Sequence, residues 1–179
     1  MVIAGIDYSL RGPAVCVWKG DATTPFEFKH CKFYYLTDTK KYAKTFINNI
    51  HGSIFDEYNH ECERYDTISS WAVDVCYGCE EVALEGYAYG AKGRILKYKF
   101  FQASIPVDVI TPSEIKKKAT GSGNASKHDM HLAFTKETGY NLLAAITPDK
   151  KEVSNPVSDI IDSYYVCKRL WQKIWIERV

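Results

Sequence analysis

The stretch Val2-Ile3-Ala4-Gly5-Ile6-Asp7 is a short apolar run that ends in a carboxylate. A turn-forming segment, Ser9–Pro13, follows it, and Ala14–Trp18 is a second apolar run. Two such runs joined by a turn predict a β-hairpin. The first strand of this hairpin carries Asp7 at its carboxyl end.

The rest of the chain alternates predicted strands with predicted helices. Strands are expected at Phe26–Leu36, Glu80–Glu85 and Val107–Ile110 because these runs are apolar or aromatic at their centres. Apolar spacing predicts helical segments at Tyr42–Val75 (broken or kinked at Gly52-Ser53), Gly90–Ala103, Ala125–Thr138 and Pro156–Trp175. The pattern predicts one α/β domain, residues 1–179, with a mixed five-stranded sheet flanked by helices.

The net charge of +1 hides a strongly uneven distribution of charge along the chain. Residues 51–90 hold nine acids and a single base, Arg64. Residues 91–127 hold only two acids against eight bases: Lys92, Arg94, Lys97, Lys99, Lys116, Lys117, Lys118 and Lys127. Such a basic segment favours a polyanionic partner such as nucleic acid. A solvated lysine-rich face explains the composition alone equally well.

The termini and the cysteines bear on where the protein works. The first 18 residues lack a basic leader and place Asp7 where an apolar signal core would run. No apolar stretch approaches the roughly 20 residues that span a bilayer. Six cysteines without a secretory signal indicate reduced thiols. We therefore expect a cytoplasmic protein with no membrane partner.

Four carboxylates are the candidates for chemistry. Asp7 and Glu85 each end a predicted buried strand, and Asp159 and Asp162 are spaced three residues apart on one helix face. If that helix packs on the sheet, the four converge and require cations to stay ionised. Oxygen ligands select hard cations, so Mg²⁺ is expected, with Mn²⁺ as a substitute. Two ions about 3.5–4 Å apart would suit hydrolysis of a phosphodiester.

Each carboxylate has a plainer explanation when it is taken alone. Asp7 is compatible with a turn-forming role before Arg11-Gly12-Pro13, and Glu85 with an exposed strand end. Asp159 and Asp162 fit solvated residues near a helix N-terminus. The apolar setting of Asp7 and Glu85 favours a site, because an unpaired carboxylate is costly there.

Four blocks carry a more specific resemblance. They are Ala4-Gly5-Ile6-Asp7-Tyr8-Ser9, Val82-Ala83-Leu84-Glu85-Gly86, the pair Thr111–Lys117 and Thr120–Lys127, and Asn155–Ser163 with its Asp-x-x-Asp. In this order and over nearly the whole chain, they resemble the motifs of RuvC-type Holliday junction resolvases. The resemblance is closer to the bacteriophage-encoded relatives.

The resemblance implies a ribonuclease H-like fold, a homodimer and Mg²⁺-dependent paired nicking of four-way or otherwise branched DNA. It places Asp7, Glu85, Asp159 and Asp162 at the metal site and Lys127 near the scissile phosphate; an ordinary surface lysine is the alternative for Lys127. Residues 90–102 look shorter than the corresponding dimer-forming segment of the family. The family's aromatic wedge has its nearest counterparts in Tyr87 and Tyr89, for which a core role is at least as reasonable.

The sequence therefore predicts a structure-selective endonuclease without a small-molecule cofactor. DNA phosphates would be contacted by Lys92, Arg94, Lys97, Lys99, Lys116, Lys117 and Lys118. Two alternatives stay open: a ribonuclease H-like or flap nuclease acting on RNA–DNA hybrids, and a DNA-binding scaffold without catalysis.

Overall fold

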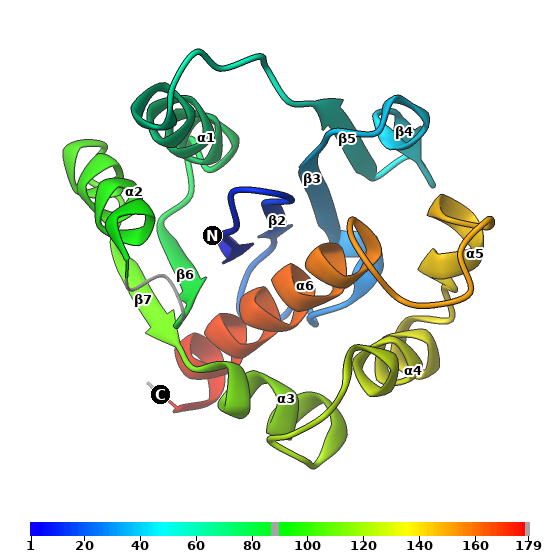
Figure 1. Ribbon diagram of the computed structural model, residues 1–179. Helices are drawn as coiled ribbons and strands as arrows, with labels where there is room; N and C mark the ends of the chain where they lie inside the picture. The colour runs from blue at the N-terminus through cyan, green and yellow to red at the C-terminus, as the bar shows by residue number, and fades with distance from the viewer. Residues whose placement is uncertain (87–89, 178–179) are drawn as a thin grey trace.

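The predicted hairpin lies at the centre of the sheet. In the computed structural model, which describes residues 1–86 and 90–177, β1 (Val2–Asp7) pairs antiparallel with β2 (Ala14–Lys19). On its other side β1 pairs in parallel with β6 (Glu81–Glu85), where Ile6 lies opposite Leu84. Asp7 and Glu85 therefore end neighbouring parallel strands at the same edge of the sheet. Figure 1 shows β6 between the N-terminal strand and β7.

The described residues form one mixed sheet in the order β4-β5-β3-β2-β1-β6-β7. The remaining strands are β3 (Cys31–Thr37), β4 (Thr45–Phe46), β5 (Ile50–Ile54) and β7 (Val107–Ile110). The predicted α/β class and mixed sheet are confirmed, although the sheet has seven strands where five were expected. Phe26–His30 precedes β3 as a loop with the 3₁₀ turn η1 (Phe28–His30), so the third strand starts later than predicted.

The two additional strands lie where the sequence predicted a helix, and that part of the prediction is wrong. Between the turn η2 (Lys40–Tyr42) and β5, Ile47 and Asn48 adopt positive φ and reverse the chain. β5 then pairs in parallel with β3, from Phe33 opposite Ile50 onward. The spacing of Tyr42, Phe46 and Ile50 is helical, but pairing with the free edge of β3 satisfies more backbone groups. Local periodicity carries no information about that distant partner.

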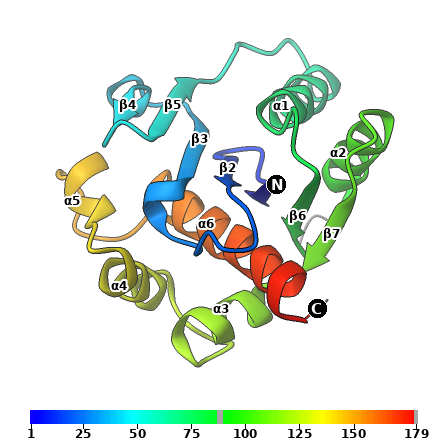
Figure 2. The same ribbon diagram turned by 180° about the vertical axis from the view of Figure 1, so that it is seen from behind.

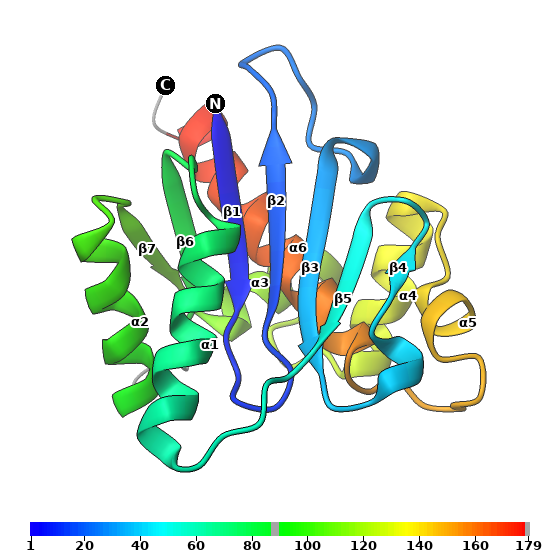
Figure 3. The same cartoon turned by 90° about the horizontal axis from the view of Figure 1, so that it is seen from above.

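Helices cover both faces of the sheet (Figures 2 and 3). On one face Ile68 of α1 and Leu96 and Phe100 of α2 pack on Ile6 and Leu84. The other face is covered by α6, with α3, α4 and α5 around it. The helices span Glu61–Val75 (α1), Ala91–Gln102 (α2), Pro112–Thr120 (α3), Lys127–Thr138 (α4), Leu142–Ile146 (α5) and Val157–Gln172 (α6), and the π-helical turn η3 (Lys173–Glu177) follows.

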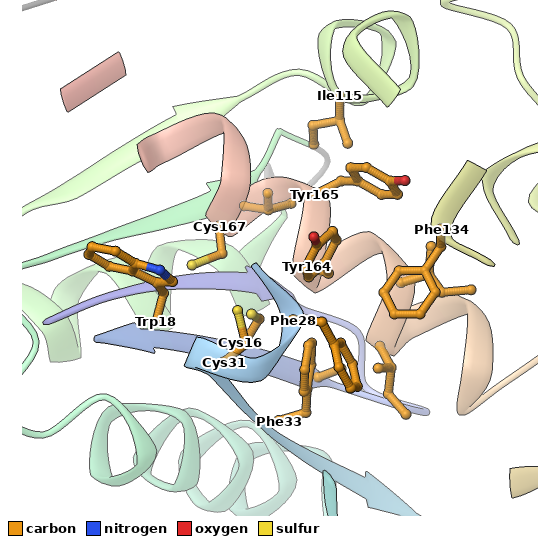
Figure 4. Packing of buried hydrophobic residues seen from close by; sticks show 14 of the residues in the cluster. Cys16, Trp18, Phe28, Cys31, Phe33, Ile115, Phe134, Tyr164, Tyr165 and Cys167 are labelled. Carbon is orange, nitrogen blue, oxygen red and sulfur yellow. The ribbon is translucent and has the colours of Figure 1, made fainter. Parts of the chain in front are cut away.

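Aromatic side chains fill the space between α6 and the sheet. The ring of Tyr164 lies 6.3 Å from that of Phe33 and 5.1 Å from that of Phe134, between β3 and α4 (Figure 4). Cys16 and Cys167 are completely buried beside them. Because aromatic pairs add to the free energy of burial, this layer holds α6 firmly on the sheet.

Gly5 allows α6 to approach β1 closely. A Cβ atom at position 5 would lie 2.1 Å from the backbone nitrogen of Cys167 and 2.6 Å from the carbonyl oxygen of Ser163. Only glycine leaves room for a helix backbone at that distance. The glycine in the strand that ends at Asp7 thus sets the position of the helix that carries Asp159 and Asp162.

Candidate active site

Three of the four predicted carboxylates line one cavity at the carboxyl ends of the strands. This cavity of about 460 Å³ is bordered by Asp7 from β1 and by Asp159 and Asp162 from the first two turns of α6. Lys92 and Lys127 also line it. Asp159 is only 7% exposed, whereas Asp7 and Asp162 are partly exposed. Because Arg11 lines the cavity as well, its wall combines three acids with three bases.

Glu85 belongs to the same cluster electrostatically. Burial raises the pKa of Glu85 to about 7, the nearby Asp162 raises it as well, and Lys116 opposes the shift. Burial also raises the pKa of Asp7 well above its ordinary value, and the charges of Asp159, Glu85 and Asp162 add to that rise. Each carboxylate thus makes its neighbours harder to ionise.

The two aspartates of α6 behave in the same way. Burial raises the pKa of Asp159 to about 7, helped by Asp162 and opposed by Lys127. Burial raises the pKa of Asp162 to about 6, while Lys127 and Lys116 oppose the rise. Four neighbouring acids with raised pKa values, three of them lining the cavity, favour a site that would accept a cation.

The chemistry of this cluster fits a hard divalent cation. The Oδ2 atom of Asp159 is buried and has no hydrogen-bond partner among the described residues, so a strong acceptor there is unsatisfied. In residues 1–86 and 90–177, however, no three Asp, Glu, His or Cys side chains lie close enough together to hold an ion as they stand. The mutual repulsion of the acids and the unsatisfied oxygen of Asp159 nevertheless fit a cation, around which the ligand side chains would close. The four carboxylates would have to rotate before they could coordinate it.

A hydrogen-bonded group connects Lys127 to the acids. Lys127 is the first residue of α4, and its Nζ donates to Ser158 Oγ at 3.4 Å. The Ser158 hydroxyl lies 3.1 Å from Asn155 Oδ1 and 3.3 Å from Asp159 Oδ1, and it donates to one of them. Ser158 is only 3% exposed, so the surrounding packing restricts its side chain. Ser158 and Asn155 position a lysine against a carboxylate, and the sequence prediction missed both roles although both residues stand in the quoted Asn155–Ser163 block.

The basic residues of α3 divide into two groups. Lys116 faces the acids, because its charge acts on both Glu85 and Asp162. Lys117 and Lys118 are exposed on the same helix. The helix begins with Thr111 as its cap and Pro112 in the first turn. Arg169 of α6 pairs with Glu114 at 2.6 Å, and this ion pair holds α3 next to the site.

The basic residues of α2 have varied surroundings. Lys92 lines the carboxylate cavity, whereas Arg94 borders a separate one with Tyr98. Lys99 pairs with Asp66 of α1 at 2.7 Å and donates to Ser70 at 2.8 Å. Lys97 is partly buried and engaged in an interaction of its own. The predicted wedge residues Tyr87 and Tyr89 lie outside the described residues.

A larger cavity, about 750 Å³, lies between α3 and α4 but carries no comparable chemistry. Its acids already have partners: Asp129 forms a capping box with Ser126, and Glu137 pairs with Lys168 at 2.6 Å. No helix among the described residues is both long enough and apolar enough to cross a bilayer. The carboxylate cavity remains the candidate active site.

Comparison with known proteins finds the same architecture in solved structures. No protein-family model and no curated protein matches the sequence. RuvC from Thermus thermophilus has a TM-score of 0.61 and 20% identity, covering 98% of this chain and 96% of that one. The same protein in complex with a Holliday junction substrate has a TM-score of 0.62 and 19% identity, with 99% and 96% covered. The fowlpox virus Holliday junction resolvase has a TM-score of 0.52 and 15% identity, with 98% and 100% covered. The chain therefore has the fold seen in Thermus thermophilus RuvC and in the fowlpox virus Holliday junction resolvase, the RuvC-type resolvase fold expected from its sequence.

Proposed function

We propose that the chain is a divalent-metal-dependent endonuclease that resolves Holliday junctions and other branched DNA by paired nicking. The observation that carries the proposal is the cavity where Asp7, Asp159 and Asp162 meet beside Glu85, with the pKa values of all four raised. The likeness in fold to RuvC and to the fowlpox virus resolvase supports the substrate class.

The four carboxylates would hold the metal in this mechanism. Two Mg²⁺ or Mn²⁺ ions bound by Asp7, Glu85, Asp159 and Asp162 would activate a water molecule and stabilise the leaving oxygen of a phosphodiester. Lys127, held by Ser158, would lie against the negative charge that grows on the phosphate. Lys92 and Lys116 would draw the DNA backbone over the cavity.

The test of this function is incubation with four labelled substrates, with and without Mg²⁺. In the presence of Mg²⁺, a four-way junction should be nicked in two strands at symmetric positions, and without the metal it should stay intact. Linear duplex, flap and RNA–DNA hybrid should be cut poorly under the same conditions. If the enzyme cuts the hybrid or the flap faster than the junction, that nucleic acid becomes the proposed substrate in place of the junction. If the protein binds the junction but cuts nothing in Mg²⁺ or Mn²⁺, the result would favour a non-catalytic DNA-binding scaffold over a nuclease.

Symmetric nicks require two active sites, so the proposal includes a homodimer. Tyr98 and Phe101 of α2 are 60% and 77% exposed, which offers apolar surface for a second copy. Sedimentation analysis of the free protein measures this directly. A strictly monomeric enzyme that still cuts in symmetric pairs would remove the dimer from the proposal.

Replacing Ser158 by alanine tests the positioning of Lys127. The Ser158→Ala variant should lose about 10–100-fold in cleavage rate, as is typical when a partner of the metal ligands is removed. Binding of the junction should change little, because Ser158 is buried and does not reach DNA. Single-turnover cleavage and equilibrium binding separate the two effects.

The matched control is Ser163→Ala on the same helix, where the hydroxyl donates to the carbonyl oxygen of Ile160. This variant should cut normally, and Ser158→Thr should recover part of the lost rate. Equal rates in the two alanine variants would show that Ser158 has no positioning role.

Neutralising Lys116, Lys117 and Lys118 together should weaken junction binding and flatten its dependence on salt. Each lost phosphate contact lowers the slope of log K against log salt by about 1. Titrations at several salt concentrations give the slope. Lys136→Gln, a single change in a basic residue near the end of α4, is the control. A slope that equals that of the parent protein would exclude this patch from the DNA interface.

A further inference from the structure

A second cavity adjoins the carboxylates at the end of β3. Its volume is about 290 Å³, and it shares Arg11 and Asn155 with the carboxylate cavity. Its far wall is formed by Thr37, which ends β3, and by the two residues that follow it. Because β1 and β3 both pair antiparallel with β2, their carboxyl ends lie at one edge of the sheet (Figure 3). The second cavity therefore extends the candidate active site along that edge.

A partly buried ammonium group forms one side of this cavity. Lys150 Nζ donates to Ser154 Oγ and to the backbone oxygen of Asn155, both at 2.9 Å. It also lies 5.2 Å from the centre of the Tyr42 ring. An ammonium has three donors, so one is left for a ligand. No carboxylate of the described residues forms an ion pair with Lys150, and the adjacent Asp149 is paired with Lys41.

The second cation is Arg11, in the turn between β1 and β2. Arg11 is exposed, and its guanidinium forms no hydrogen bond or ion pair with any residue that the structure describes. It lies on the wall that the two cavities share. Asp38 is the one acid among the residues that line the second cavity, so the two cations outnumber it. The lining of the second cavity therefore carries a net positive charge.

We propose that Arg11 and Lys150 form a phosphate-binding subsite for the strand that is cut. It would take a backbone phosphate flanking the scissile one, on the β3 side of the carboxylates. Arginine matches phosphate with a two-pronged donor set, and a fixed lysine adds a point charge. Contacts of this kind set the register of a strand on the protein. The inference rests on the proposed nuclease function for the identity of the strand.

Binding measurements in Ca²⁺ test the subsite without cleavage. Arg11→Ala and Lys150→Gln should each weaken binding of a four-way junction and lower the salt slope by about 1. Asp38→Asn should strengthen binding, because it removes a repulsive charge. Lys151→Gln is the matched control: this neighbouring lysine is exposed and does not line the cavity, so its binding should equal that of the parent.

A scan with methylphosphonates locates the phosphate. Replacing one backbone phosphate at a time by a neutral methylphosphonate should weaken binding to the parent protein at one flanking position. The Arg11→Ala variant should be insensitive at that same position. If Lys150→Gln disturbs the start of α6 and fails to fold, Arg11→Ala alone carries the test, because its side chain is exposed.

The outcomes separate this inference from the proposed function. If Arg11→Ala and Lys150→Gln bind as tightly as Lys151→Gln while the parent nicks junctions, the subsite is wrong and the nuclease stands. If both variants bind more weakly but no substrate is ever cut, the cavity binds nucleic-acid phosphate and the nuclease proposal fails. A scan in which the parent and Arg11→Ala lose affinity at the same positions would also overturn the subsite.

Discussion

An Asp7→Asn variant should bind a four-way junction as well as the parent does and should not cut it. Asp7 ends β1 and lies among the other three acids, so in the proposed mechanism its charge would be needed to hold a cation between them. We expect a loss of at least about 10²–10³-fold in cleavage, the range seen when one group that stabilises transition-state charge is removed. Asparagine keeps the shape of the side chain, so the fold should be unaffected.

The control for this experiment is Asp74→Asn, which neutralises an exposed aspartate near the end of α1. It should cut at the parent rate. Single-turnover nicking and junction binding are measured for both variants at equal protein concentration. Parental cleavage by Asp7→Asn would refute the assignment of the site, whereas loss of binding as well would give Asp7 a structural role.

Without divalent cations, the folded protein should become less stable as the pH rises from about 4 to about 7. The pKa of Asp159 is about 7 in the folded chain, against an ordinary value of 3.8, and Glu85 and Asp162 shift in the same direction. Between these pH values the folded state holds more protons than the unfolded state, so its stability falls with rising pH. Because the pKa values of all three acids are raised, their effects on stability have the same sign and reinforce one another.

Adding Mg²⁺ should reverse this loss above pH 7 and have little effect near pH 4. The cation binds the ionised carboxylates of the folded state and stabilises it by mass action. Thermal unfolding in EDTA and in Mg²⁺, across this pH range, measures both effects. The idea is contradicted by a melting temperature that rises with pH in EDTA, or by an equal response to Mg²⁺ at both ends of the range.

The Asp162→Asn variant tests whether the four carboxylates cause this loss of stability at high pH. Removing one of the mutually repelling charges should make the metal-free protein more stable than the parent at pH 8 and reduce its response to Mg²⁺. Many functional sites trade stability for activity in this manner. If Asp162→Asn shows the same pH curve as the parent, the loss arises outside the carboxylate cavity.

Local pattern was sufficient for much of the fold. The short apolar run that ends at Asp7, followed by a turn and a second apolar run, predicts a strand, and β1 is buried along its centre. Gly90–Ala103 and Pro156–Trp175 were predicted as helices, close to the observed α2 and α6. The failure between Tyr42 and Ile50 has a definite cause, since β4 and β5 depend on the distant edge of β3.

The sequence by itself determined which residues end strands and which share a helix face, and so it identified Asp7, Glu85, Asp159 and Asp162 as candidates. Strand and helix periods are local properties, and side chains at strand ends or three residues apart follow from them directly. Only the tertiary structure decided that these acids meet, because the approach of α6 depends on the missing Cβ of Gly5 against Cys167, which lies far along the chain. It also decided that Ser158 holds Lys127 and that Arg11 and Lys150 share a cavity. Contacts between distant segments leave no period in the sequence, so packing alone reveals them.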